Sequence, residues 1–455
     1  MTKTFYSILT NTLFAALVNT FVWFAATFWV YLETRSVLTT AVMAGVYSGT
    51  IAVTGFFLGS LVDRYPKKRV MLGSSAVSLL FYIVAASIYG FSTPETLTDT
   101  STPLLWIFIV LTLFGALAGN VRTIALSTLV TVLVEERQRD RANGMVGTAT
   151  GVAFLAASVF SGLAIGFLGM FWVLGLGVIF TALAFLHLWF IPLVSPAPIN
   201  PEDATSEDAA PSKLDVRETI GVVRSVPGLF GLIFFQTFNN FLGGVFMALM
   251  DAYGLQLVSV QVWGILWGAL SLGFIVGGLA VARWGLGPSP LRVLFLVNIV
   301  MWIICMVFPL QASIVLLAVG MFVWLCLIPV AEAAEQTILQ TTIPPGHQGR
   351  VFGFAQSLEQ AASPITAFMI GPIAQLIFIP FMTTGRGVEL IGGWFGTGPD
   401  RGIALVFILV GVLGLIITLL AMRSPAYKRL LANGNLKRVG GEVTAEVTAE
   451  SATGA

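Results

Sequence analysis

Long apolar stretches dominate this sequence and constrain its fold more than any other feature. About 20 apolar residues in a helix cross the hydrocarbon core of a bilayer, and the chain holds twelve stretches of that length. Of its 455 residues, 57% are hydrophobic and 10% are charged, whereas a soluble domain carries roughly 25% charged residues. The sequence therefore predicts an all-α membrane protein. We expect the spans at 5–32, 38–62, 69–91, 103–134, 142–166, 169–193, 228–253, 259–282, 291–309, 312–341, 350–381 and 402–422.

Lysine and arginine are distributed unevenly between the two sets of loops that join these spans. Basic residues in short loops remain on the cytoplasmic side of a membrane. We therefore expect both termini in the cytoplasm and a multi-pass protein of the inner or plasma membrane. The basic set is Lys3, Arg64, Lys67, Lys68, Arg69, Arg137, Arg139, Arg141, Arg283, Arg292, Arg350, Arg423, Lys428, Arg429, Lys437 and Arg438, against Arg35, Arg386 and Arg401 on the other side.

One polar segment interrupts the apolar pattern near the middle of the chain. Residues 195–215 are rich in Pro, Ala, Ser, Asp and Glu, a composition that predicts disorder. Residues 214–225 place Val216, Ile220 and Val223 on one side of a short amphipathic helix. We therefore predict four parts: a six-helix bundle at 1–194, a cytoplasmic linker at 195–227, a second six-helix bundle at 228–423 and a cytoplasmic tail at 424–455.

The two predicted bundles share short sequence matches at equivalent places. Residues 141–144 and 350–353 both read Arg-x-x-Gly between the fourth and fifth spans of their halves, and residues 55–61 match 273–279 as Gly-Phe-x-x-Gly-x-Leu. Parallel repeats of this kind are typical of transporters that rock two halves about a central site. The alternative is chance similarity between apolar segments.

The loop after the second span carries the most specific local motif. It reads Gly-x-Leu-x-Asp-Arg-x-Pro-Lys-Lys-Arg over residues 59–69, and it resembles the signature loop of the major facilitator superfamily, which has Gly where Pro66 stands. The resemblance implies a gate in which Asp63 meets the start of the eleventh span, around residues 349–353. Gly59 would permit close helix approach, and Arg64 and Arg69 would anchor the loop at anionic headgroups. The alternative is an ordinary basic cytoplasmic loop.

Two further stretches, 135–144 and 343–352, resemble the macrolide and multidrug efflux branch of that superfamily, which includes enterobactin-exporter-like proteins. The resemblance runs from about residue 11 to residue 422. It implies twelve transmembrane helices in two pseudo-symmetric bundles and proton-driven export of amphipathic molecules. The sequence departs from many drug/proton antiporters in one respect, because their Gly-Pro pair in span five is absent here and occurs instead at Gly371-Pro372.

Five ionisable residues stand out inside predicted spans, namely Arg122, His187, Glu332, Glu335 and Glu359, and His187 is expected to be a packed or interfacial histidine. A charge at the bilayer centre costs roughly 2.5–3.5 kcal/mol or more, so such residues are candidates for function. Glu332 and Glu335 share a helix face, and two close carboxylates in a low dielectric cannot easily both be ionised. We therefore predict a proton-carrying site at these two residues.

Arg122 and Glu359 have predicted roles beside that carboxyl pair. In the superfamily, spans four and ten both line the central cavity, so the resemblance implies that Arg122 and Glu332 face each other. Arg122 would bias the proton or hold an anionic substrate. Glu359 would form a gate hydrogen bond. The alternative to these roles is a structural ion pair between helices.

Polar and aromatic side chains on spans one and seven are candidates for substrate binding. Amides and an indole on cavity helices suit an amphipathic ligand, and polar contacts between helices are the alternative. These residues are Asn19, Trp23, Gln236, Asn239, Asn240 and Met247.

The sequence contains no Walker-type phosphate loop, no metal-ligand cluster and no nucleophile triad. We therefore predict a transporter without cofactor, metal or enzymatic activity. Its expected partners are a small amphipathic substrate, protons and membrane lipids but not nucleic acid, and we expect a monomer. The alternatives to proton-coupled antiport are an uncoupled facilitator, a lipid or siderophore translocator of the same fold, and a receptor or scaffold without transport.

Overall fold

The structure, a computed structural model, describes residues 2–34, 37–99, 101–192 and 216–432. Within these ranges the chain is helical throughout, and twelve helical spans are long and apolar enough to cross a membrane. The predicted twelve-helix membrane fold is thereby confirmed. The predicted disorder at 195–215 and most of the predicted tail lie outside the described residues.

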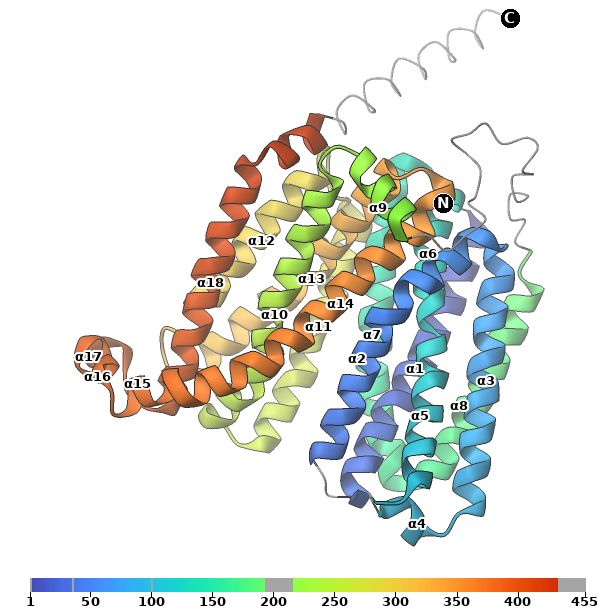
Figure 1. Ribbon diagram of the computed structural model, residues 1–455, viewed down its shortest axis with the longest axis horizontal. Coiled ribbons are helices and arrows are strands. Elements are labelled where there is room, and N and C mark those ends of the chain that lie inside the picture. Colours follow the sequence, from blue (N-terminus) through green and yellow to red (C-terminus); the bar gives the residue numbers. More distant parts are fainter. Residues whose placement is uncertain (1, 35–36, 100, 193–215, 433–455) are drawn as a thin grey trace, which may run out of the picture.

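The helices form two halves that lie side by side (Figure 1). The first half contains α1 (Lys3–Thr34), α2 (Val37–Arg64), α3 (Lys67–Phe91), α4 (Pro94–Thr98), α5 (Pro103–Ala118), α6 (Asn120–Leu133), η1 (Glu136–Gln138), α7 (Arg139–Leu168) and α8 (Met170–Phe190). The linker helix α9 (Val216–Ser225) precedes the second half, which contains α10 (Leu229–Leu257), α11 (Val260–Trp284), α12 (Pro290–Val307), α13 (Ile314–Thr342), η2 (Pro345–His347), α14 (Gln348–Ile373), η3 (Ala374–Phe378), α15 (Ile379–Thr383), α16 (Arg386–Leu390), α17 (Gly392–Phe395) and α18 (Pro399–Arg423).

Glycine and proline set the breaks within and between the spans. Gly119 separates α5 from α6, so the fourth span consists of two helices. Gly169, with φ of 79°, forms the very short turn between α7 and α8, a conformation that glycine adopts without steric cost. The eleventh span contains Pro364 and Pro372 and continues into the π-helix η3. Because proline removes a backbone donor, these positions disturb the regular hydrogen-bond ladder.

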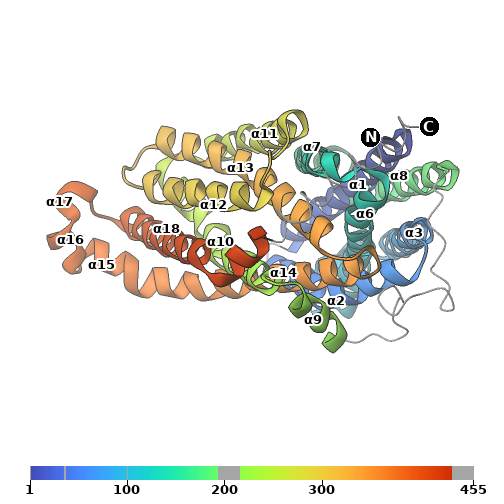
Figure 2. The same cartoon turned by 90° about the horizontal axis from the view of Figure 1, so that it is seen from above.

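The two halves meet at one end of the bundle and diverge toward the other (Figure 1). We call the end where α1 begins and α18 ends the terminal end. Seen along the bundle, α14 lies against α2, and α7 lies against α11 (Figure 2). The hydrogen bonds between the halves include one from α14 to Asp63 on α2 and several between α7 and α13. The structure is therefore closed at the terminal end.

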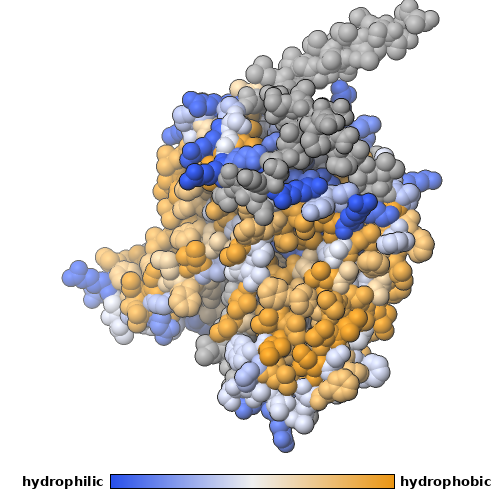
Figure 3. Space-filling model, turned by 45° about the vertical axis from the view of Figure 1, so that its right-hand side comes forward, coloured by the Kyte–Doolittle hydropathy of each residue, from blue (hydrophilic) through white to orange (hydrophobic). Residues whose placement is uncertain are grey.

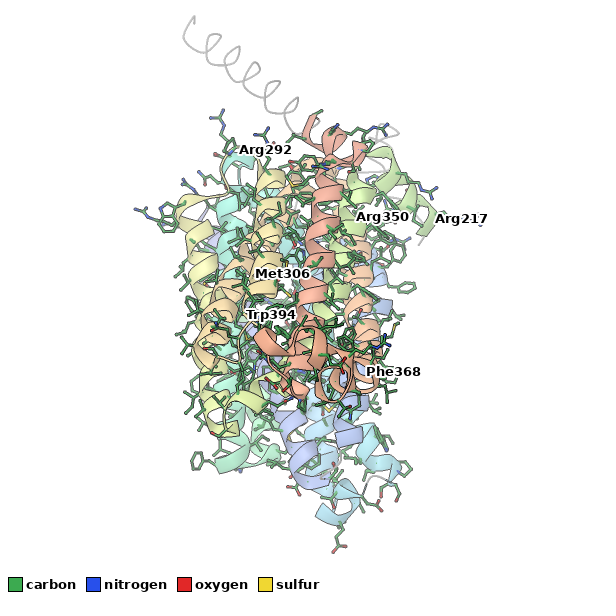
Figure 4. All side chains as sticks on the ribbon, turned by 90° about the vertical axis from the view of Figure 1, so that its left-hand side faces the viewer. Arg217, Arg292, Met306, Arg350, Phe368 and Trp394 are labelled. Atoms are coloured by element: carbon green, nitrogen blue, oxygen red, sulfur yellow. The ribbon has the colours of Figure 1, made fainter. Side chains whose placement is uncertain are left out.

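The outer surface is apolar over the body of the bundle and polar at the terminal end (Figure 3). Large apolar side chains such as Phe167, Phe190 and Ile265 are exposed on the outer surface of the helices, as is expected where lipid is the solvent. Arg217 and Arg292 reach outward at the terminal end, whereas Arg350 lies among the helices (Figure 4). Phe368 and Trp394 lie on the exposed flank toward the opposite end (Figure 4).

Candidate transport site and gate

Three glutamates from two helices form a carboxyl cluster inside the second half. Glu332 and Glu335 lie on α13, and Glu359 lies on α14. The side chain of Glu335 is buried and accepts a hydrogen bond of 2.6 Å from Nε2 of Gln236 on α10. Glu335 and Glu359 also hydrogen-bond to each other through their carboxyl groups. A bond between two carboxyl groups requires one of them to carry a proton, which makes this pair a candidate proton site.

Glu332 occupies the accessible side of the carboxyl cluster. It interacts electrostatically with Glu335 one helical turn away. The side chain of Glu332 is exposed to solvent, whereas Glu335 is buried. Within the described residues none of the three glutamates forms an ion pair. Glu332 is therefore an accessible acid that no cation of the described chain neutralises.

The predicted opposition of Arg122 and Glu332 is wrong. Arg122 is 2% exposed and donates to the side chains of Asn11 and Ser75 and, at 3.3 Å, to the carbonyl of Met71. These acceptors lie on α1 and α3, so the guanidinium points into the core of its own half. The physical reason is that a buried guanidinium needs several acceptors, and the nearby helices of the first half supply them.

Asn11 completes this arginine site and was not among the predicted residues. Its Nδ2 donates to the carbonyl of Ala184 at 2.8 Å and lies 3.1 Å from Nδ1 of His187. Asn11 thereby joins α1, α6 and α8 around Arg122. A single amide in an apolar span gives no pattern in the sequence, so only the packing of the helices identifies its partners.

Three of the candidate substrate residues form hydrogen bonds within the protein. The Tyr82 hydroxyl donates to Asn19 Oδ1 at 3.0 Å. Trp302 Nε1 donates to Asn239 Oδ1 at 3.1 Å. Asn240 donates to the carbonyl of Gln236 on its own helix. The amides of Asn19 and Asn239 hold helices together, which is the alternative that the sequence left open, whereas that of Asn240 bonds within α10.

Trp23 and Gln236 retain the strongest geometric case for contact with a ligand. Trp23 stacks on Tyr47 with ring centroids 4.3 Å apart, so an aromatic surface lies on α1 and α2. Gln236 bonds directly to the carboxyl cluster. The side chain of Met247 lies outside the described part of the structure. Among the described residues, no group of three or more His, Cys, Asp and Glu side chains is arranged to hold a metal ion.

Asp63 meets the start of α14, as the motif predicted. Its two carboxylate oxygens accept the backbone N–H groups of Gly349 at 2.7 Å and Arg350 at 2.8 Å. The side chains of Asp63 and Arg350 are each 2% exposed and lie 3.6 Å apart. A carboxylate at a helix N-terminus is stabilised by the unpaired N–H groups and by the helix dipole. The arrangement fastens α2 to α14 across the two halves.

The remaining motif residues lie at the edge of this contact. Gly59 packs against the backbone of Gly349 so closely that a Cβ atom would not fit. Arg64 is partly buried, and its Nη2 has no hydrogen-bond partner in the described chain, whereas Arg69 is exposed at the start of α3. Pro66, which replaces the usual glycine, precedes α3 with φ of −52°, an angle that suits proline.

An amide network joins α7 and α13 at the terminal end. Nδ2 of Asn143 donates to Thr337 and to Gln340, both at 2.9 Å. Nε2 of Gln340 donates back to Asn143 at 3.2 Å and to the carbonyl of Ser127 at 3.0 Å. These side chains are buried or largely buried, so the network seals the interface where the two halves meet.

The internal repeat also appears in the hydrogen bonds of this region. In each half, one side chain at the start of the fifth span donates to two carbonyls at the end of the fourth. The equivalent pairs are Arg139 with Thr131 and Val134, and Gln348 with Gln340 and Ile343.

Comparisons with known proteins agree with this architecture. The chain is 24% identical over 328 residues to macrolide efflux protein A from Enterococcus faecalis, a match that covers 69% of this chain and 94% of that protein. Among solved structures, it resembles an outward-facing bacterial homologue of the iron transporter ferroportin, soaked with iron, with a TM-score of 0.68, 14% identity and coverage of 93% and 100% of the two chains.

The proton:xylose symporter XylE has the same fold, with a TM-score of 0.61, 12% identity and coverage of 91% of this chain and 94% of that one. The human organic anion transporter MFSD10 matches with a TM-score of 0.58, 14% identity and coverage of 91% and 100%. The sequence model of the Major Facilitator Superfamily matches residues 8–367. The chain is therefore a multi-pass membrane transporter that belongs to the Major Facilitator Superfamily.

Proposed function

We propose that the protein is a proton-coupled antiporter that exports amphipathic, positively charged molecules from the cytoplasm. The observation that carries this proposal is the carboxyl cluster, in which Glu335 and Glu359 are placed to share one proton beside the accessible Glu332. Antiport requires a site that holds either a proton or a substrate. Neighbouring carboxyl groups in a low dielectric provide such a site because adding a cation favours loss of the proton.

The distribution of charge around the cavity supports a cationic substrate. Glu332 is accessible and has no cationic partner within the described residues. Arg122 is buried and committed to Asn11, Ser75 and Met71, so its charge is not available to an anion. The aromatic pair Trp23 and Tyr47 offers a surface for the apolar part of a ligand.

The direction of transport rests on the orientation of the gate and on the likeness to an efflux protein. The basic residues of the terminal end support a cytoplasmic position for that end under the positive-inside rule. Asp63 with the start of α14 and the network of Asn143 and Gln340 then form the cytoplasmic gate. The likeness to macrolide efflux protein A favours an efflux substrate over a nutrient.

Reconstitution into proteoliposomes tests the proposal. A pH gradient would be imposed across the membrane while the fluorescent cation ethidium and a pH-sensitive dye report the two fluxes. The native protein should accumulate ethidium against its gradient and move protons in the opposite direction. Glu332→Gln should reduce ethidium transport by about tenfold or more, because it removes the accessible carboxylate.

Glu389→Gln is the matched control, since this acid lies on the short helix α16 away from the cavity. It should transport as the native protein does. Ethidium flux that ignores the pH gradient in the native protein would contradict antiport and would favour an uncoupled facilitator.

A further inference from the structure

Besides the amide network of α7 and α13, two helix pairs join the halves at the terminal end, and the sequence motif places an acid in only one of them. The first pair is α2 with α14, where Asp63 on α2 accepts backbone N–H groups of α14. The second pair is α7 with α11. In the repeat alignment Val281 and Ala282 of α11 occupy the place of Asp63, so α11 itself supplies no acid to the second contact.

The structure places an acid there from the opposite helix. Asp140, in the first turn of α7, accepts the backbone N–H of Leu286 with Oδ2 at 2.8 Å. Leu286 follows α11, so this bond joins the two halves. The other carboxylate oxygen, Oδ1, accepts the N–H of Arg141 at 2.7 Å. Asp140 therefore uses one oxygen to stabilise its own helix start and the other to reach across the gate.

The loop after α11 is shaped to receive this carboxylate. Gly285 and Gly287 have φ of 71° and 70°, a left-handed conformation that favours glycine. A Cβ atom on Gly285 would come within 2.6 Å of Asp140 Oδ2. The loop thus approaches the carboxylate at a distance that only glycine allows, which a simple capping role for Asp140 does not require.

We propose that Asp140 is the second acidic latch of the gate, with the acid carried by α7 instead of α11. The inference rests on the proposed function in one respect, namely that this end opens during transport. When the halves separate at the terminal end, α7 moves from α11 and the bond from Leu286 to Asp140 breaks. Asp140 therefore stabilises the closed state in the same way as Asp63, from the opposite side of the pseudo-two-fold axis.

Asp140→Asn separates this role from capping of α7. Asparagine keeps one acceptor for the N–H of Arg141, so the start of α7 remains capped. Its amide nitrogen, however, is a donor and cannot accept a hydrogen bond from the N–H of Leu286, so the bond across the gate is lost. The variant should therefore keep the fold and weaken the closed gate. Leu286→Pro removes the donor from the other side, and Gly285 tolerates a following proline because its ψ is −170°.

The population of the open gate can be read from the alkylation of a cysteine beside the closed interface. Ser127→Cys provides that cysteine, because Ser127 is partly buried and its backbone lies at the contact between the halves, in a chain whose native thiols, Cys305 and Cys326, are replaced by serine. The carbonyl of residue 127 is bonded to Gln340 of the other half when the gate is closed. The probe is a water-soluble maleimide added to purified protein in detergent, without substrate or pH gradient.

Asp140→Asn and Leu286→Pro should each raise the alkylation rate about tenfold, which corresponds to the loss of one charge-assisted bond. Asp63→Asn should act in the same direction, and Glu135→Gln, an exposed acid before α7, should leave the rate unchanged. An unchanged rate in both Asp140→Asn and Leu286→Pro, together with a faster rate in Asp63→Asn, would overturn the latch. Because the readout uses neither protons nor substrate, it is independent of whether the protein is an antiporter.

Discussion

At the residue scale, the two halves handle their buried charge in opposite ways. The first half encloses its arginine, since Arg122 is bonded to Asn11, Ser75 and Met71 and is removed from solvent. The second half leaves acid accessible, since Glu332 opens to solvent beside the bonded pair of Glu335 and Glu359. A buried charge without an opposite partner is costly unless its hydrogen bonds are satisfied, which explains why Arg122 has several acceptors.

Replacing Glu359 with glutamine should uncouple transport without abolishing it. Glutamine has the shape of a protonated glutamic acid, and its amide can still donate to Glu335, but it cannot release a proton. Exchange of ethidium across the membrane at equal pH should therefore remain within about twofold of the native rate, whereas accumulation driven by a pH gradient should be lost. Counterflow and gradient-driven uptake in the same proteoliposomes provide the measurement. Retained uptake against the ethidium gradient in Glu359→Gln would contradict the shared-proton role.

Replacing Asn11 with alanine should destabilise the first half. The change leaves a buried guanidinium short of an acceptor and breaks the link to His187, and an unsatisfied buried group costs about 1–3 kcal/mol. Thermal unfolding in detergent would show the loss as a lower melting temperature. Asn298→Ala is the control, because Asn298 is also buried but, in the described chain, bonds to Leu294 on its own helix. Equal melting temperatures for the two variants would contradict a supporting role for Asn11.

At the scale of elements, glycine determines how closely the helices of the gate approach. Gly59 on α2 faces the backbone of Gly349, and Gly144 on α7 faces Val281 and Ala282 on α11. At both places a Cβ atom would collide with backbone rather than with a movable side chain. The closed gate therefore depends on small residues in both helix pairs.

Substitution of Gly59 by valine should open the terminal end. The added side chain would separate α2 from α14 and stretch the bonds from Gly349 and Arg350 to Asp63. The alkylation rate of a cysteine at position 127 should rise about tenfold or more, because the gate loses both its packing and a charge-assisted bond. Gly73→Val is the control, because it has the same cost in helix propensity while a Cβ atom on Gly73 meets no other atom. Its alkylation rate should equal that of the native gate. An equal rate in the two variants would contradict the close-approach argument.

The sequence predicted most of these elements because spans and short motifs are local patterns. Apolar length located the twelve spans, and the loop at residues 59–69 identified the contact of Asp63 with the start of α14. The partners of Arg122 could not be predicted, because Asn11 and Ser75 are single polar residues on other helices whose rotation depends on tertiary packing. Asp140 was missed for a related reason. The repeat points to α11 as the helix equivalent to α2, whereas the acid of the second helix pair lies on α7.

At the scale of the whole molecule, the carboxyl cluster and the contacts that close the terminal end lie on the same two helices. The helix α14 carries Glu359 of the carboxyl cluster and also begins at the Asp63 contact. The helix α13 carries Glu332 and Glu335 and ends in the amide network with Asn143. Arg350 adds a further contact, because it lies 3.2 Å from Glu218 on the linker helix α9. A change of charge in the cluster therefore acts on the same two helices that close the terminal end.

The most direct test of this account is the release of protons when substrate binds to the purified protein. Ethidium would be added to the protein in weakly buffered detergent near neutral pH, while a pH-sensitive dye records protons and the fluorescence of ethidium records binding. The native protein should release about one proton per bound cation. Glu359→Gln should bind ethidium without releasing a proton. Binding to the native protein without proton release, or equal release by the variant, would contradict the claim that the carboxyl cluster exchanges a proton for substrate.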